Sequence, residues 1–330
     1  MSYPLISFCM PVYNHAHCVV AAIDGALAQT YPNLEIIISD DSSTDNTWEV
    51  VNKTLQGYDG PHKIRLNRNA KNLGITGHVN KLFELASSDI LVMAAGDDVS
   101  APDRVEKIAS VFLKSPDVCM VSSEYSRWYP NGIAVPTSAC TGGVEIINPE
   151  KDLYNTYFGR NFLGATLAYR KCVFTKFGEL SAWCKAEDVI MIRRAMLTGK
   201  IGYIREPLVK YRIEGGASKT RSKSLSQSVE FNRMMNTGNR QMLEDYLSTG
   251  REQNDSIAIA LRSRISESIY YIEALSSPSL FVRIKNGFRY LMNSKSFIKK
   301  KVFVFVFCWF PLRFADRAFG FLYTKNLAPS

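Results

Sequence analysis

Short apolar-rich runs alternate with helix-like patterns over about the first 115 residues. Four of the runs predict buried strands, at residues 5–10, 34–39, 64–66 and 90–93. Four stretches in which apolar residues recur three or four positions apart predict helices after these strands, around residues 19–27, 48–55, 79–85 and 105–112. Strands and helices that alternate in this way are typical of an α/β domain with a mostly parallel sheet.

The remainder of the chain is less regular. Further elements are predicted as strands at residues 118–122, 162–169, 201–204 and 208–212, and as a helix at 189–197. Residues 128–143 are rich in Pro, Gly, Ser and Thr and predict a loop. From about residue 226 to 291 the pattern is helical, with breaks near Gly250 and Pro278. The sequence therefore predicts a helical extension after the α/β domain.

Two adjacent acids follow the strand predicted at 90–93. Residues 94–96 are Ala-Ala-Gly, small enough for another molecule to approach the backbone, and Asp97 and Asp98 come next. Ligands of open α/β sheets bind at the carboxyl ends of the strands. Two carboxylates there suit Mg²⁺ or Mn²⁺, which would hold a phosphorylated substrate. The same residues would also suit a loop and cap before the helix that Pro102 opens, and this stretch alone does not decide between the two.

Acids stand at two further places where a ligand could bind. Asp40 and Asp41 follow the second predicted strand, and Asp41 could accept a hydrogen bond from a nucleobase N–H. Glu187 and Asp188 directly precede a predicted apolar helix, and Asp188 could accept a proton from a hydroxyl nucleophile. Each pair alone could be a helix cap, but three acidic pairs in this order favour an active site.

An ordered series of motifs makes the interpretation more specific. The series comprises Pro11-Val12-Tyr13-Asn14, Gln29-Thr30-Tyr31, residues 35–45 (EIIISDDSSTD), Asn72-Leu73-Gly74, Gly96-Asp97-Asp98 with Pro102 and Arg104, and Glu187-Asp188. In this series the chain resembles the inverting nucleotide-sugar glycosyltransferases of family 2, which have the GT-A fold. The resemblance covers about residues 5–211, roughly two thirds of the chain.

The resemblance assigns expected roles to single residues. The residues expected to bind the nucleotide, a uridine diphosphate, are Pro11, Tyr13, Asn14, Asp41, Asn72, Gly74 and Asp97. Asp98 is expected to ligate Mn²⁺ or Mg²⁺ on the diphosphate, and Asp188 to be the catalytic base. The resemblance implies that an acceptor hydroxyl attacks the sugar in one displacement that inverts the anomeric configuration.

Two positions depart from the family pattern. Ala95 stands where many members have a further acid, and Glu214 lies near the place of a histidine that can touch the metal or diphosphate. The third metal ligand is therefore left open. Residues expected to form an acceptor or diphosphate loop are Glu187, Trp183, Glu214 and Lys219.

The charge of the chain is concentrated at one end. The formal net charge is +9, and residues 283–325 contain ten Lys or Arg against one acid, so the rest is neutral overall. This distribution indicates one anionic partner surface for the tail and argues against nucleic acid as a partner. The apolar run 302–312 follows three lysines and is shorter than the roughly 20 residues that span a bilayer. It predicts either a membrane-surface contact or packing against the body.

Three regions are expected: a glycosyltransferase domain at 1–220, a helical extension at 221–294 and a membrane-associating tail at 295–330. The seven cysteines show no metal-binding spacing, and no signal-peptide pattern opens the chain, so we expect a cytoplasmic protein that is peripheral on the inner face of the membrane. The expected function is sugar transfer to a saccharide acceptor, lipid-linked, in surface polysaccharide or O-antigen biosynthesis. The alternatives are a catalytically inactive scaffold at the membrane, or a nucleotidyltransferase, whose glycine-rich basic loop is not found near the first strand.

Overall fold

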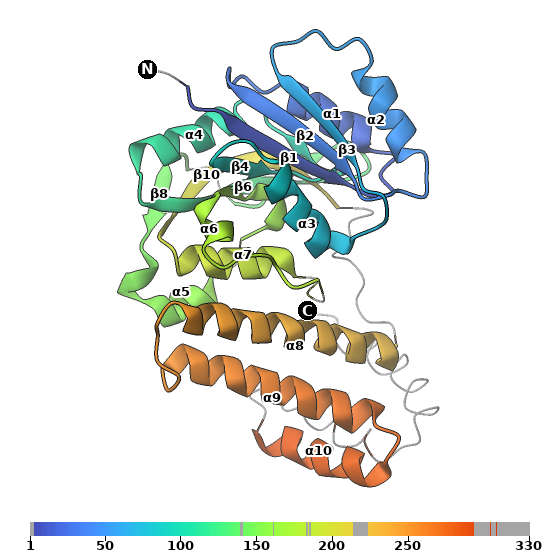
Figure 1. Cartoon of the computed structure of the whole chain (residues 1–330), viewed down its shortest axis with the longest axis vertical. Helices are drawn as coiled ribbons and strands as arrows, with labels where there is room; N and C mark the ends of the chain where they lie inside the picture. Colours follow the sequence, from blue (N-terminus) through green and yellow to red (C-terminus); the bar gives the residue numbers. More distant parts are fainter. Residues whose placement is uncertain are drawn as a thin grey trace. The chain divides into compact units, whose positions relative to one another are not determined.

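The structure is a computed structural model that describes residues 3–138, 141–160, 162–182, 184, 186–213, 224–293, 304 and 308. The chain forms two compact units, Met1–Gly216 and Ala217–Ser330. The first unit contains the sheet and the second contains long helices (Figure 1). We describe each unit by itself.

The first unit is built on one sheet of ten strands with the order β3-β2-β1-β4-β9-β6-β10-β5, while β7 pairs with β6 and β8 with β10. The strands are β1 (Ile6–Val12), β2 (Leu34–Asp40), β3 (Lys63–Arg68), β4 (Ile90–Met93), β5 (Val99–Ser100), β6 (Val118–Trp128), β7 (Ala134–Pro136), β8 (Val144–Ile147), β9 (Ala168–Arg170) and β10 (Lys200–Arg212). The pairs β1–β2, β2–β3, β1–β4 and β6–β10 are parallel. The predicted α/β fold is thus confirmed, with antiparallel strands added around β9, β5, β7 and β8.

Helices cover both faces of this sheet. They are α1 (Val19–Leu27), α2 (Thr47–Leu55), α3 (Gly74–Leu85), α4 (Arg104–Lys114), α5 (Leu153–Gly159), α6 (Cys172–Thr175) and α7 (Glu187–Met196). Alternate residues of β1 and β2, such as Phe8 and Ile36, join a core with α1, α2 and α4. Their neighbours, such as Ser39, point to the other face, where His78 of α3 meets the Ser39 hydroxyl. Burial on both faces explains why these strands are almost continuously apolar.

The prediction of a strand at 162–169 is mostly wrong. Only Ala168–Arg170 forms a strand (β9), and Gly164–Thr166 forms a short 3-10 turn, η2. Side chains take the backbone groups that a longer strand would need: Arg104 bonds the Ala165 carbonyl at 2.9 Å, and the Thr166 hydroxyl bonds the Leu163 carbonyl at 2.8 Å. The strands predicted at 201–204 and 208–212 are in fact one strand, β10, with register shifts on both sides of Pro207.

The described residues of the second unit form three helices, α8 (Leu225–Ser248), α9 (Ser256–Ser276) and α10 (Leu280–Asn293). They lie side by side, with α9 in contact with both others (Figure 1). The breaks predicted near Gly250 and Pro278 are confirmed. Asp255 caps α9, because its Oδ1 accepts the backbone N–H of Ile257 at 2.8 Å. The buried apolar cluster of this unit includes Val304 and Cys308.

Candidate active site

The turn after β4 is pressed against the end of β1. The backbone N–H of Gly96 donates to the Pro11 carbonyl at 3.2 Å. A Cβ at position 96 would lie 2.6 Å from both His15 Nδ1 and Val12 Cγ1, so only glycine fits there. Because Val12 pairs with Asp40 of β2, the polar segments after β1, β2 and β4 meet at one edge of the sheet.

Asp98, in this turn, is buried with one carboxylate oxygen satisfied and the other free. The side chain is 6% exposed, and its Oδ1 accepts the backbone N–H of Arg212 at 2.8 Å. Its Oδ2 is also buried, and no described residue donates a hydrogen bond to it. Burial, with the nearby Asp97 second, raises the pKa of Asp98 to about 7. A buried carboxylate oxygen without a donor is an arrangement that a bound cation would satisfy.

Two arginines fix the position of the turn. Arg212 Nε donates to the Asp97 carbonyl at 3.1 Å, and its guanidinium lies 4.2 Å from the centre of the Trp128 ring. Arg104 is fully buried and donates to the Met93 carbonyl at 2.7 Å and the Ser100 hydroxyl at 2.8 Å. Burial lowers the pKa of Arg104 to about 10. Both cations therefore bind backbone and hydroxyl groups of the turn and leave the Asp98 Oδ2 free.

The oxygen ligands of the turn suit a divalent cation whose remaining ligands come from a substrate. Among the described residues, no three His, Cys, Asp or Glu side chains lie close enough to hold a metal by themselves. Mg²⁺ and its relatives are commonly held by one or two carboxylates, with waters and substrate phosphates as the remaining ligands. The free Oδ2 of Asp98, with Asp97 beside it, matches that pattern.

Asp41 directly follows β2, and one of its two carboxylate oxygens accepts two hydrogen bonds. It is buried, and its Oδ1 accepts from Asn69 Nδ2 at 2.8 Å and from the backbone N–H of Leu73 at 2.9 Å. Its own N–H donates to the Val12 carbonyl at 3.0 Å. Because Oδ1 already has two donors, Oδ2 is the oxygen that remains to accept from a ligand.

A row of polar side chains continues from Asp41 into the interior. Asn67 Nδ2 donates to Asn69 Oδ1 at 2.9 Å and to the Ser39 hydroxyl at 2.8 Å. The Ser39 oxygen also lies 2.8 Å from Nε2 of the buried His78, whose pKa is lowered by burial. These contacts orient the Asn69 amide as a donor to Asp41. The sequence did not predict this row, because its members become neighbours only across β2, β3 and α3.

The other residues expected at the nucleotide shape this edge. Tyr13 is exposed, and Pro11, next to last in β1, accepts the Gly96 N–H. Asn14 has a left-handed backbone (φ 54°), and its Oδ1 accepts from the Thr44 N–H at 2.9 Å. Before α3, Asn72 Oδ1 accepts the N–H of Gly74, also left-handed (φ 71°), at 2.9 Å. Asn72 and Gly74 thus form the turn that brings the Leu73 N–H to Asp41.

Asp188 lies in the first turn of α7 and rests on η2. Its Oδ1 accepts the Val189 N–H at 2.7 Å, and a Cβ on Gly164 would lie 2.9 Å from its Oδ2. Burial raises the pKa of Asp188. Burial, and secondly the charge of Asp188, raises the pKa of Glu187 to about 8. Carboxylates with raised pKa values are suited to accepting a proton near neutral pH.

Two structural links hold the Asp188 segment to the rest of the site. Arg104, which holds the turn of Asp98, also bonds the carbonyl of Ala165, the residue after Gly164. On α3, Asn80 exchanges two hydrogen bonds with the backbone of Leu180, at 2.9 and 3.0 Å. Thr76, on the same helix face as Asn80, bonds the Cys184 carbonyl. Trp183, Glu214 and Lys219 lie outside the described residues.

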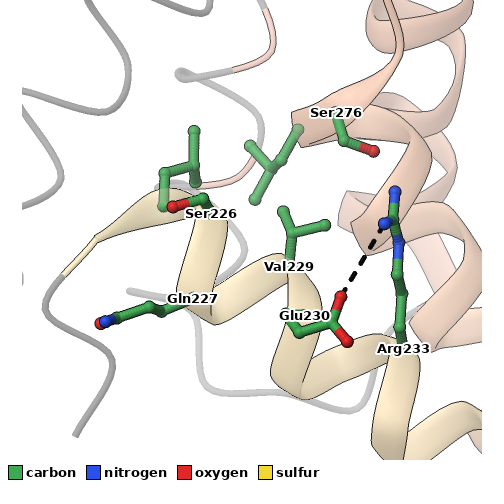
Figure 2. Close-up of a pocket in the computed structure, with 8 residues that line it drawn as sticks. Ser226, Gln227, Val229, Glu230, Arg233 and Ser276 are labelled. Carbon is green, nitrogen blue, oxygen red and sulfur yellow. Dashed lines mark ion pairs between the residues drawn. The ribbon is translucent and has the colours of Figure 1, made fainter.

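The second unit contains an open hollow of about 590 Å³. Its walls are formed by Leu225, Ser226, Gln227, Val229, Glu230, Arg233, Leu275 and Ser276 (Figure 2). Glu230 is the one acid among these described lining residues, and it pairs with Arg233 at 3.8 Å. The hollow therefore offers no free carboxylate, and we place the chemistry at the sheet edge.

The α/β sheet with three acidic sites at or near one edge defines an enzyme of the group-transfer type. Residues 7–172 match the family Glycosyl transferase family 2. The chain therefore belongs to this family and is a glycosyltransferase.

Relatives among characterised and uncharacterised proteins agree. An uncharacterised glycosyltransferase of Nostoc sp. is 29% identical over 68% of this chain and 70% of its own length. The UDP-Glc:alpha-D-GlcNAc-diphosphoundecaprenol beta-1,3-glucosyltransferase WfgD of Escherichia coli is 31% identical over 46% of this chain and 54% of its own. The chondroitin synthase of Pasteurella multocida is 34% identical over 39% of this chain, but the match spans only 13% of that longer protein.

Solved structures support the fold. The crystal structure of S. aureus TarS 1-349 in complex with UDP superposes with a TM-score of 0.59 at 14% identity, over 92% of this chain and 90% of that one. At this identity the likeness establishes the architecture, a GT-A sheet with helices after it.

Proposed function

We propose that the chain moves one sugar from a UDP-linked donor to a saccharide acceptor with inversion at the anomeric carbon. The observation that carries the proposal is the free, buried Oδ2 of Asp98 on the sheet edge that also bears Asp41. Family membership and a neighbour that was crystallised in complex with UDP support it. The transferase chemistry is assigned to residues 1–220, with 221–294 as a helical extension.

Nucleotide binding is assigned to the two strand ends beside β1. Asp41 Oδ2 accepts the N–H of the uracil ring, while its Oδ1 stays with Asn69 and Leu73. Asp97 and Asp98 hold Mn²⁺ or Mg²⁺ through the free Oδ2 and the neighbouring carboxylate. When bound, the cation neutralises the diphosphate leaving group. Glu214 and the Lys219 loop remain the proposed source of further diphosphate contacts.

Proton transfer is assigned to Asp188. The acceptor oxygen forms a bond to the sugar C1, the bond from C1 to the diphosphate oxygen breaks, and its electron pair leaves with the UDP. Asp188 accepts the proton of the attacking hydroxyl, a task that its raised pKa favours. Glu187 and Trp183 are proposed to border the acceptor. A single displacement of this kind inverts the configuration and needs no covalent intermediate.

A lipid-linked acceptor in surface polysaccharide synthesis is the proposal that the E. coli relative supports, since its printed substrate is a diphosphoundecaprenol-linked sugar. We further propose that the protein works at the inner membrane face, with residues 295–330 on an anionic surface. None of the described helices is both long and apolar enough to cross a membrane. Val304 and Cys308 of this tail are buried in the helical unit, so these two side chains pack on the protein.

A donor screen tests the proposal. The purified chain is incubated with a panel of UDP-, GDP- and dTDP-sugars, with Mn²⁺ or with EDTA, and nucleotide release is measured with and without a lipid-diphosphate saccharide. We expect release from one or more UDP-sugars that requires Mn²⁺, and Asp188→Asn should lose it by about 10²–10⁴-fold. Release from no UDP-sugar, or equal release in EDTA, would overturn the proposal.

A further inference from the structure

Helix α10 exposes a row of large apolar side chains. Phe281 is 74%, Met292 65% and Phe288 55% exposed. Its inward face is mixed: Tyr290 joins the buried apolar cluster of the unit, and Arg283 and Asn286 are buried beside it. Several large apolar side chains exposed on one helix face are the kind of surface that binds a partner or a membrane.

Specific contacts fix the rotation of α10 in the unit. Asn286 Nδ2 donates to Glu273 Oε2 of α9 at 2.7 Å, and Arg283 lies against the Ala274 carbonyl, with Nε at 3.4 Å. A Cβ at Gly287 would lie 2.6 Å from Cys308 Sγ, so Cys308 lies directly against α10 at this glycine. Rotation of α10 that buried the phenylalanines would break these hydrogen bonds and the contact with Cys308.

The outward face combines apolar bulk with positive charge. Phe281, Lys285, Phe288 and Met292 recur at helical spacing and form one stripe, and Arg289 lies at its margin. Lys285 and Arg289 are exposed, and α10 contains no Asp or Glu. An exposed apolar stripe with bordering cations and no acids is the composition of a helix that lies in a membrane interface.

We propose that the outward face of α10 is a docking surface for an anionic lipid bilayer, with Phe281, Phe288 and Met292 inserted among the lipids and Lys285 and Arg289 against the headgroups. The charges argue against a second copy of the chain as the occupant. A two-fold contact would bring Lys285 and Arg289 of both copies together with no acid in the stripe to offset them. The residues of this surface all belong to α10 and precede the tail 295–330 in the sequence.

The docking proposal rests on the proposed function in one respect, because a membrane-borne acceptor gives membrane docking a role in the reaction. Vesicle binding needs neither nucleotide nor acceptor, so the two proposals can fail separately. UDP-sugar turnover in vesicle-free buffer reports the proposed function, and it should be the same in the wild-type chain and in every variant of α10.

The experiment is co-sedimentation of the full chain with phosphatidylcholine vesicles that contain or lack 30% phosphatidylglycerol. Phe281→Ser with Phe288→Ser should lower the bound fraction on anionic vesicles by about fivefold or more, as should Lys285→Glu with Arg289→Glu. The matched control is Phe231→Ser with Ile259→Ser, which removes two other apolar side chains, each more than half exposed, from α8 and α9. It should bind within about twofold of wild type, and thermal melts should show all variants folded.

Three results would overturn the inference. One is a wild-type chain that does not sediment with anionic vesicles. Another is binding that both α10 variants keep while Lys299→Gln, Lys300→Gln and Lys301→Gln together abolish it, which would assign docking to the tail alone. The third is a wild-type dimer by light scattering that Phe281→Ser with Phe288→Ser converts to a monomer without loss of vesicle binding, which would make a second copy the partner.

Discussion

The backbone N–H of Arg212 donates to Asp98 Oδ1 at 2.8 Å, and the second oxygen of this buried carboxylate has no donor in the part of the chain that the structure describes. The contact joins the end of β10 to the turn after β4, residues more than a hundred positions apart. It fixes the direction of the carboxylate without neutralising it. Buried acids that lack full hydrogen-bond partners lower the free energy of unfolding when they are ionised.

Asp98→Asn should make the protein more stable. Because the pKa of Asp98 is raised to about 7, the folded state holds the proton more tightly than the unfolded state, and stability is lost as pH rises from about 4 to about 7. Asparagine removes the buried charge and can keep the Arg212 contact. We expect a gain of about 2 kcal/mol at pH 8 and a rise in Tm of about 4–8 °C. Asp89→Asn, at the exposed start of β4, is the control and should leave Tm unchanged; a lower Tm for Asp98→Asn would contradict the account.

Glu187→Gln should flatten the pH dependence of stability. The pKa of Glu187 is raised to about 8, so the folded state holds the proton more tightly than the unfolded state, and stability is lost as pH rises from about 4.5 to about 8. Thermal melts at pH 4.5 and 8.5 measure this. The wild-type Tm should fall more between the two values than that of Glu187→Gln, while the two proteins should agree closely at pH 4.5. Equal falls would show that Glu187 is ionised throughout.

Gly164→Ala should damage turnover and spare nucleotide binding. The new Cβ would lie 2.9 Å from Asp188 Oδ2, so the carboxylate has to move from its position on η2. We expect kcat to fall about 10–100-fold, with the Kd for UDP within about twofold of wild type. Gly159→Ala is the matched control, because a Cβ there meets nothing within 4 Å. A normal kcat for Gly164→Ala would remove Asp188 from the reaction.

Asn67→Ala should weaken UDP binding from a distance. Asn67 Nδ2 fixes the amide of Asn69, which in turn donates to Asp41. Without it the Asn69 amide is free to turn its oxygen toward Asp41, and we expect the Kd for UDP to rise about tenfold, the worth of one such hydrogen bond. Calorimetric titration measures it, with Asn52→Ala on the exposed side of α2 as the control. An unchanged Kd would show that the row beneath Asp41 plays no part in nucleotide binding.

Sequence patterns predict well those residues whose place in the fold depends on their neighbours in the chain. The buried strands β1, β2 and β4 and the acids after them follow from apolar runs and polar breaks. The turn η2 was predicted as strand, because what stops the ladder there is the guanidinium of Arg104, which is distant in sequence. The row from Asp41 to His78 and the rotation of α10 likewise depend on partners across elements, which no local pattern contains.

The most direct test of the metal–nucleotide claim is calorimetric titration of UDP into the wild-type chain and into Asp98→Ala, each in Mn²⁺ and in EDTA. The account predicts that the wild-type chain binds UDP at least about tenfold more tightly in Mn²⁺ than in EDTA, and that Asp98→Ala binds with the weak EDTA affinity in both buffers. Metal-dependent binding that survives in Asp98→Ala would contradict it, because the free Oδ2 of Asp98 would then not be the metal ligand.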